Sequence, residues 1–178
     1  MATLETPRLL LHDLTPETRK ELFLQRTEEE IRTFLGVTTD TEWATELQKH
    51  AEGLSGYRRS FLTFYIQEKE SGKTIGSCGF HTWYLPHRRA EIGYMINDEQ
   101  WKRKGFMTEA LRPIIRYGFE VMDLNRVEAF TSIENIASQK LLKALGFKEE
   151  GLMREHYCKN GIIEDSVIFG LLHREFEF

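Results

Sequence analysis

Three consecutive β-rich runs, followed by a strand–helix–strand unit, constrain the fold of this chain more than any other feature of its sequence. FLTFYIQ (61–67) and TIGSCGFHTW (74–83) are separated by a polar turn that contains glycine, which is typical of a hairpin, and AEIGYMI (90–96) follows. The chain then has apolar residues at helical spacing over 106–122 and returns as a strand over 126–132. Because a helix that connects two strands of one sheet makes them parallel, the sequence predicts a mixed sheet of the α/β (α+β) class with helices on both faces.

The N-terminal part of the chain predicts one strand and two helices. RLLLHDL (8–14) is β-rich, and the Thr-Pro pair at 15–16 has the pattern of a cap followed by proline at the first helical position. We expect this helix to run to about Glu29. A capping-box pattern predicts a second helix from near Thr39 toward Gly53.

The C-terminal part predicts a short helix and a hairpin. NIASQKLLKALGF (135–147) has helical spacing with Asn135 as its cap. Two β-rich stretches, at about 148–158 and 162–172, are joined by KNG, which is a strong turn signal. Pro113 lies inside the longer predicted helix, where the loss of its N–H should kink or loosen that helix.

Length and composition are those of an ordinary soluble protein. With 178 residues, of which 40% are hydrophobic and 29% charged, the chain can bury a core without a disulfide, and we expect a single domain over 1–178. The net charge of −4 argues against a generic nucleic-acid binder, so no direct nucleic-acid partner is expected. Cys78 and Cys158 form no CxxC pattern, and no stretch approaches the roughly 18 apolar residues of a membrane helix. These features predict a reduced, cytoplasmic protein without membrane association.

A run of three cations precedes the longer predicted helix. Lys102, Arg103 and Lys104 are followed by Gly105, whose missing Cβ permits a positive φ and a close approach of the backbone to a ligand. A helix N-terminus exposes unpaired N–H groups and the positive end of the helix dipole, so this loop suits a phosphate or pyrophosphate, and Thr108 adds a hydroxyl. The alternative is a solvated basic loop, which is the usual state of a charge run. The stretch matches neither the Walker pattern nor the dinucleotide-binding GxGxxG pattern.

Two long segments carry a resemblance to a known family. AEIGYMINDEQWKRKGFMTEAL (90–111) followed by NRVEAFTSIENIASQKLLKALGFKEEG (125–151) resembles the GCN5-related N-acetyltransferases (GNAT), and more narrowly their RimJ/RimL-type ribosomal-protein N-acetyltransferase branch. The resemblance extends from TPRLLLHDL near the start to NGIIEDSVIFGLL near the end. The family's loop pattern is Q/R-x-x-G-x-G/A; here it reads K-R-K-G-F-M (102–107), with Lys102 replacing the first residue and Met107 the last. The resemblance implies the GNAT fold, a mixed and mostly antiparallel sheet of about seven strands, splayed at the acetyl-CoA site.

The resemblance also implies acetyl-CoA as the cosubstrate. Backbone N–H groups from Arg103 to Thr108 would hold its pyrophosphate, the pantetheine arm would bond to the main chain of the GYMI strand, and Asn135 could contact the pantetheine besides capping its helix. The implied cofactor-binding residues are Met95, Ile96, Asn97, Lys102, Arg103, Lys104, Gly105, Phe106, Met107, Thr108 and Asn135. The six histidines show no metal-ligand spacing, so no metal is expected.

Acetyl transfer from a thioester to an amine needs a base for the amine, a donor to the oxyanion and an acid for the departing thiolate. Glu91 is the first candidate for the base, because it shares a strand face with Gly93 and Met95 and matches a glutamate of the RimJ/RimL-type EIGY segment. In a half-buried cleft its pKa would rise toward the working range. The alternative is a strand carboxylate paired with Arg88 or Arg89. A water relay from Glu91, or a base supplied by solvent, also stays open.

Ser138 is the first candidate for the acid. It follows Asn135 by three residues in NIAS, and the corresponding serine of the RimL-like pattern lies near the CoA sulfur. Its alternative role is a hydroxyl bonded back to the preceding helical turn. Tyr157 is a second candidate, since a tyrosine has this role in other branches, and a backbone N–H near Met95 or Ile96 would bind the oxyanion. Neither cysteine lies beside a base, so direct attack by the amine is preferred over an acyl-enzyme.

Other side chains are weaker candidates. Glu128 is expected to face solvent on its strand. Phe34, Trp43, Trp83 and Tyr84 could line the acceptor pocket, although aromatic residues at such positions more often belong to the core.

The sequence therefore predicts an acetyl-CoA-dependent N-acetyltransferase that acts on a primary amine. The acceptor could be the N-terminal α-amine of a ribosomal protein, or a small amine such as a polyamine or an aminoglycoside. A non-catalytic CoA-sensing module on the same scaffold is the alternative from another class, and the presence of both Glu91 and Ser138 argues against it. Dimers are common in the RimJ/RimL branch, so a homodimer is one option that the sequence leaves open.

Overall fold

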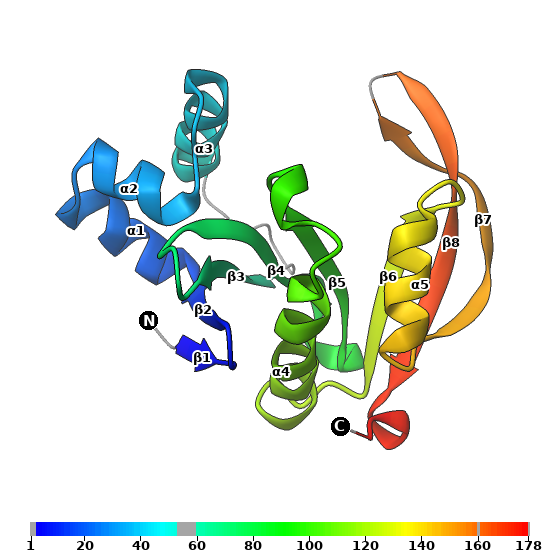
Figure 1. Cartoon of the computed structure of the whole chain (residues 1–178). Helices are drawn as coiled ribbons and strands as arrows, with labels where there is room; N and C mark the ends of the chain where they lie inside the picture. The colour runs from blue at the N-terminus through cyan, green and yellow to red at the C-terminus, as the bar shows by residue number, and fades with distance from the viewer. Residues whose placement is uncertain (1–2, 53–59, 160, 178) are drawn as a thin grey trace.

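One mixed sheet organises the molecule. The computed structural model describes residues 3–52, 60–159 and 161–177. Within them eight strands, one more than predicted, form a sheet in the order β1-β2-β3-β4-β5-β6-β8-β7 (Figure 1). The strands are β1 (Thr3–Glu5), β2 (Leu9–Leu14), β3 (Ser60–Glu68), β4 (Thr74–Tyr84), β5 (Arg89–Ile96), β6 (Arg126–Ser132), β7 (Lys148–Lys159) and β8 (Ile162–Leu172). Every neighbouring pair is antiparallel except β5 and β6, so the predicted mixed sheet is confirmed.

Helices cover both faces of this sheet, as predicted. The α-helices of the described residues are α1 (Pro16–Gln25), α2 (Glu28–Leu35), α3 (Asp40–Glu52), α4 (Phe106–Glu120) and α5 (Ile136–Ala144). Helices α4 and α5 pack on the large hydrophobic cluster of one face. On the other face, α1 to α3 share a smaller cluster with Leu14 of β2 and Tyr65 of β3. The crossover helix α4 makes β5 and β6 parallel.

The predicted helix from Pro16 to about Glu29 is wrong at its C-terminal end. Helix α1 ends at Gln25, and Thr27 and Glu30 form a second capping box that starts α2. The Thr27 hydroxyl accepts from the Glu30 N–H at 3.3 Å, while the Glu30 carboxylate accepts from the Thr27 N–H at 2.8 Å. Two backbone groups are satisfied at this new start, which favours a break over a continuous helix. The predicted end of α3 near Gly53 lies outside the described residues.

Strand β1 was not predicted. It pairs antiparallel with β2, for example Leu4 with Leu11, and is only three residues long. A segment of that length shows no recognisable periodicity, so its pairing depends on β2 being in place. The predicted turn at KNG includes Asn160, which lies outside the described residues.

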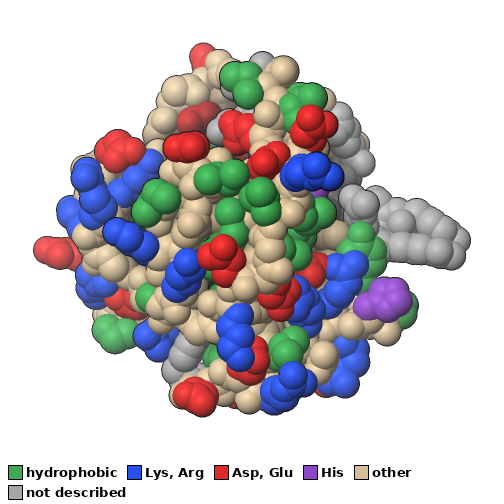
Figure 2. All heavy atoms as spheres, turned by 90° about the vertical axis from the view of Figure 1, so that its right-hand side faces the viewer, with side chains coloured by type: hydrophobic (Ala, Val, Ile, Leu, Met, Phe, Trp, Pro, Cys, Tyr) green, Lys and Arg blue, Asp and Glu red, His purple; other side chains and the backbone are tan. Residues whose placement is uncertain are grey.

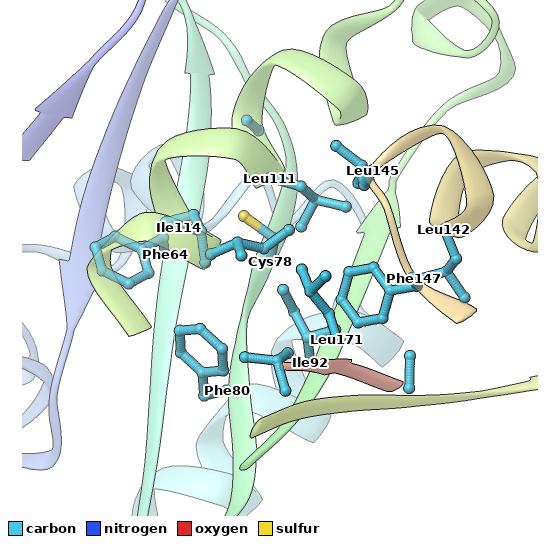
Figure 3. Packing of buried hydrophobic residues seen from close by; sticks show 14 of the residues in the cluster. Phe64, Cys78, Phe80, Ile92, Leu111, Ile114, Leu142, Leu145, Phe147 and Leu171 are labelled. Carbon is cyan, nitrogen blue, oxygen red and sulfur yellow. The ribbon is translucent and has the colours of Figure 1, made fainter. Parts of the chain in front are cut away.

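The large cluster joins the crossover helix to the centre of the sheet (Figure 3). Helix α4 buries Leu111, Ile114, Ile115 and Phe119 at the spacing that predicted it. It continues as one helix through Pro113. The labelled core residues in Figure 3 are Phe64, Cys78, Phe80, Ile92, Leu111, Ile114, Leu142, Leu145, Phe147 and Leu171. This packing fixes where α4 begins relative to β5.

The face that carries α5, β7 and β8 is open to solvent. Figure 2 shows that side chains of both charges alternate there with apolar ones. Exposed apolar side chains of these elements include Leu152, Tyr157 and Ile162. No helix of the described residues is long and apolar enough to cross a membrane.

Candidate active site

The parallel strands β5 and β6 separate halfway along their length. They pair at three positions, the last being Glu91 with Glu128. Beyond that point β5 continues to Ile96 bonded to β4, while β6 continues to Ser132 bonded to β8 (Figure 1). The facing edges of the two strands therefore carry backbone groups without a ladder partner in the described sheet, as the predicted splay requires.

The start of α4 lies next to this opening and has the predicted backbone conformation. Gly105 is the N-cap with φ of 79°, and Arg103 is also left-handed with φ of 59°. The first bond of the helix runs from the Glu109 N–H to the Gly105 carbonyl at 3.0 Å, so the N–H groups of the first turn have no partner within the helix. Lys102 and Lys104 are exposed beside them.

Hydrogen bonds of Thr6 and Arg8 to Glu109, here called the clasp, hold this helix start, and no sequence pattern predicted them. The Glu109 carboxylate accepts from the Thr6 hydroxyl at 2.7 Å, from the Arg8 N–H at 2.8 Å and from Arg8 Nε at 2.6 Å. Arg8 also donates to the Lys104 carbonyl at 3.1 Å and stacks over the Phe106 ring. About a hundred residues separate the partners along the chain, so no local pattern could indicate the contact.

Glu91 lies at the last paired position before the strands separate. Its side chain is 21% exposed, and its Oε2 lies 3.5 Å from Nδ1 of His81. Burial, with a further contribution from the charge of Glu128, raises the pKa of Glu91 to about 7. The predicted alternative of an ion pair is wrong, because Arg88 pairs with Asp123 and Arg89 pairs with Glu128.

Glu128 does not face solvent, contrary to prediction. Its side chain is 8% exposed and forms ion pairs with Arg89 and with Arg126, whose Nε lies 3.1 Å from the carboxylate. Arg126 also pairs with Glu150 of β7 at 2.6 Å. Arg89 on β5 and Arg126 on β6 itself are the partners of Glu128, so its charge is satisfied although it is buried.

Ser138 and Tyr94 meet across the opening. Ser138 Oγ and the Tyr94 hydroxyl are 2.7 Å apart, which joins α5 to β5. The Ser138 side chain is therefore bonded to Tyr94, and its N–H donates to Oδ1 of Asn135 at 3.1 Å, which confirms the predicted cap. Burial raises the pKa of Tyr94, and the hydrogen bond with Ser138 lowers it by less, so the phenol is protonated at neutral pH. Tyr94 was missed because an aromatic residue on a strand normally indicates core.

The other aromatic candidates divide between core and surface. Trp43 is buried in the small cluster with Phe34 packed against it, and Trp83 packs against the large one. Tyr84 lies under the Arg89 guanidinium. Tyr157 is 61% exposed on β7.

Two hollows are relevant to the site, and only the smaller one lies near these residues. The smaller, of about 220 Å³, is lined by His81, Gly93, Tyr94 and Met95 among others. The larger, of about 770 Å³, lies between α2, the β3–β4 turn and residues 97–101, away from Glu91 and Ser138. His81 and Tyr94 contact Glu91 and Ser138, which makes the smaller hollow the better candidate for the reacting centre. The described residues contain no group of side chains that could hold a metal ion.

Comparisons with known proteins agree with this geometry. A family model described as an acetyltransferase (GNAT) domain matches residues 8–148. The chain is 36% identical over 178 residues to the uncharacterized N-acetyltransferase p20 of Bacillus licheniformis, and the match covers 99% of each. It is 35% identical over 129 residues to the ribosomal protein uS5-alanine N-acetyltransferase of Escherichia coli (strain K12), covering 68% of this chain and 60% of that protein. A solved structure of a mutant of the spermidine N-acetyltransferase SpeG from Vibrio cholerae matches with a TM-score of 0.67 at 20% identity, over 94% of this chain and 95% of that one.

The chain therefore belongs to the GNAT acetyltransferases, a family that uses acetyl-CoA. It is an N-acetyltransferase, and its relatives include ribosomal-protein N-acetyltransferases at modest identity.

Proposed function

We propose that the protein transfers the acetyl group of acetyl-CoA to a primary amine by direct attack, with Glu91 as the base and Ser138 as the acid. One observation carries the proposal. Glu91 and Tyr94 differ by an odd number of positions on β5, so they lie on opposite faces of the strand at the opening. The thiolate can be protonated from one face by Ser138, which is bonded to Tyr94, while the amine loses its proton on the other.

The residues at the start of α4 fit the diphosphate of the cosubstrate. Gly105 has the left-handed conformation that brings the backbone close to a ligand, and a Cβ there would lie 3.5 Å from the Arg8 guanidinium. The residues proposed to hold the diphosphate are Lys102, Arg103, Lys104, Gly105, Phe106, Met107 and Thr108. Phe106 is buried, so it would contribute only its N–H. Acetyl-CoA itself supplies the activated acetyl group.

The edge of β5 that faces the opening is suited to the pantetheine and to the developing oxyanion. The Asn97 N–H donates to the Ile75 carbonyl of β4 at 2.9 Å. Because N–H groups alternate between the two sides of a strand, the N–H of Ile96 is expected to point toward β6 and that of Met95 toward β4. Ile96 is therefore the better oxyanion donor of the two. Met95, Asn97 and Asn135 remain proposed contacts of the pantetheine.

An acyl-enzyme route receives no support from the cysteines. Cys78 is buried, and burial raises the pKa of its thiol well above the usual range. Cys158 is exposed on β7. No base is recorded in contact with either thiol among the described residues, so direct attack by the amine is the proposed route.

The charges around Glu91 favour a cationic acceptor. Arg89 and Arg126 are paired with Glu128 and Glu150, which leaves Glu91 as the carboxylate of this group without a cationic partner in the described residues. An ammonium group can enter beside Glu91 and lose its proton there.

We propose the N-terminal α-amine of a protein as the acceptor. The similarity to the uS5-alanine enzyme, at 35% identity over 68% of this chain, supports this choice. A polyamine is the second candidate, and its support is the fold likeness to the spermidine enzyme.

Isotopically labelled acetyl-CoA added to a lysate, with mass-spectrometric detection of acetylated products, tests the function without bias. Thiol release with an Ala-initiated peptide, spermidine and an aminoglycoside then ranks the acceptors. The proposal expects turnover on at least one amine that is strongly reduced near pH 7 in Glu91→Gln. Saturable binding of acetyl-CoA with no turnover on any amine would support the non-catalytic alternative instead.

A further inference from the structure

His81 is a polar neighbour of Glu91 that no sequence pattern indicated. It lies on β4 directly opposite Glu91 in the antiparallel register, and its Nδ1 approaches Glu91 Oε2 to 3.5 Å. The His81 side chain is 46% exposed, so the ring is partly accessible to solvent while Nδ1 lies near the carboxylate.

The backbone of β5 leaves room for this ring. A Cβ built on Gly93 would lie 2.7 Å from Nε2 of His81 and 2.9 Å from its Cδ2, so a side chain at position 93 would displace the ring. After His81 the β4–β5 register shifts, and Thr82 has φ of 54°, an unfavourable conformation for a β-branched residue. The ring thus lies over Gly93 at the last regular position of β4, next to the small hollow that both residues line.

Other charges near the pair are already engaged. Charged groups on the neighbouring part of the sheet include Arg89 on β5, Arg126 and Glu128 on β6, and Glu150 on β7, and these four pair with one another. Burial lowers the pKa of His81, so the ring is neutral at neutral pH and carries a single N–H. That N–H can be placed on Nδ1, facing Glu91.

We propose that His81 is the positioning residue of the proton acceptor: a small rotation of the ring, away from the Thr82 hydroxyl that Nδ1 now contacts at 3.5 Å, closes the 3.5 Å gap to Glu91 Oε2, so that Nδ1–H donates to the carboxylate and holds it beside the ring. This inference rests on the proposed function, in which Glu91 takes the proton of the amine. His81 itself binds neither substrate and carries no proton between them. A neutral N–H donor stabilises the ionised carboxylate, so loss of the ring favours the protonated acid.

The first test measures Glu91 directly and needs no substrate. The pKa of Glu91 is read from the ¹³C carboxyl shift of glutamate-labelled protein, with Glu91→Gln used for assignment. In His81→Leu, which keeps an apolar group but loses the donor, we expect this pKa to rise by about 1. His81→Asn keeps a donor near the Nδ1 position and should restore most of the value, whereas His87→Leu, on the exposed 3₁₀ turn after β4, should leave it unchanged. Equal pKa values in the wild type and His81→Leu would overturn the proposal.

The second test uses turnover. In His81→Leu, kcat should fall about 10-fold with an unchanged KM for acetyl-CoA, and the acidic limb of the pH–rate profile should move to higher pH. Gly93→Ala should displace the ring and move that limb in the same direction. If His81 had only a structural role, His81→Leu and His81→Asn would both lower Tm and leave the acidic limb of the pH–rate profile unmoved. That result would contradict the proposal. If the wild type acetylates no amine, the proposed function fails, and the carboxyl titration still decides whether His81 acts on Glu91.

Discussion

Two glutamates in register on neighbouring strands of this site differ in whether an arginine pairs with them. Glu91 and Glu128 are paired in the parallel ladder, yet two arginines satisfy Glu128, and none of the arginines that the structure describes pairs with Glu91. The unpaired carboxylate has the raised pKa, because burial and a nearby like charge both disfavour its ionised form. A largely buried carboxylate with a perturbed pKa, next to a residue that lines a hollow, is a functional candidate on physical grounds.

The pH dependence of turnover should follow Glu91. A base must be unprotonated to act, so kcat/KM is expected to rise with pH through about 7, the pKa of Glu91. Glu91→Gln should lower the rate by about 100-fold near pH 7 and by less at alkaline pH, where more of the amine is already neutral. Initial rates from pH 5.5 to 9.5 check this. A variant profile parallel to that of the wild type would remove Glu91 from the role of base.

Ser138 and Tyr94 should act as a unit. Ser138→Ala is expected to lower kcat by about 100-fold with little effect on acetyl-CoA affinity, because only the departing thiolate needs the proton. Tyr94→Phe removes the partner of the 2.7 Å hydrogen bond and should also lower kcat. The double variant should be no worse than Ser138→Ala alone, which a double-mutant cycle measures. Additive losses in kcat would show that the two residues act independently. Tyr157→Phe is measured alongside as the comparison variant at the other acid candidate.

At the scale of the elements, the start of α4 is set by contacts from outside the helix. Burial by itself raises the pKa of Glu109, but the hydrogen bonds from Thr6 and Arg8 outweigh it, so the pKa is lowered. The carboxylate accepts from three donors, and Arg8 stacks on the first residue of the helix. This clasp makes the N-terminal segment part of the proposed diphosphate site.

Breaking the clasp should weaken cosubstrate binding without altering the chemistry. Glu109→Gln keeps the shape of the side chain but removes the charge that holds Arg8, and we expect KM for acetyl-CoA to rise about 10-fold at nearly constant kcat. Since the folded pKa of Glu109 is lowered, its contribution to stability is present at neutral pH and is lost as pH falls through that pKa. Calorimetric titration of coenzyme A measures the affinity, and Glu120→Gln, at the far end of α4, is the matched control. An unchanged affinity in Glu109→Gln would contradict this role.

At the scale of the molecule, the opening between β5 and β6 separates two differently packed halves of one sheet. One side of each strand remains bonded to a neighbour, β4 for β5 and β8 for β6, so the sheet can part in the middle without losing its edges. The large cluster packs α4 and α5 across the gap on one face. This packing holds the sheet together even though the buried, ionised carboxylate of Glu91 lowers the stability of the folded state.

The burial of Glu91 predicts that the proposed base lowers the stability of the folded protein at neutral and alkaline pH. The folded pKa of Glu91 is raised, so stability is greatest below the unfolded value of 4.5 and falls as pH rises to about 7. Glu91→Gln should therefore be more stable than the wild type at pH 8, by about 2 kcal/mol more than at pH 5. Urea denaturation at both pH values measures the difference. If the difference in free energy of unfolding between variant and wild type were the same at both pH values, the pKa of Glu91 would not be raised by folding.

Much of the fold was readable from local patterns, because strand alternation, helical spacing and caps act over a few residues. The meander, the crossover helix with its N-terminal glycine and the Asn135 cap were all predicted. The break between α1 and α2 was missed, although TEEE at 27–30 carries a capping-box pattern that could have indicated it.

The side-chain partners in the site could not be predicted from local sequence patterns. Periodicity along β5 sets which face Glu91 occupies, but Glu91, Glu128, Ser138 and Glu109 each have a partner on another element or segment of the chain. Which arginine reaches which carboxylate depends on strand register and on the packing of α4 and α5. Local sequence thus specifies the elements and their faces, whereas side-chain pairing and burial, which set the pKa values, exist only once the sheet and helices have assembled.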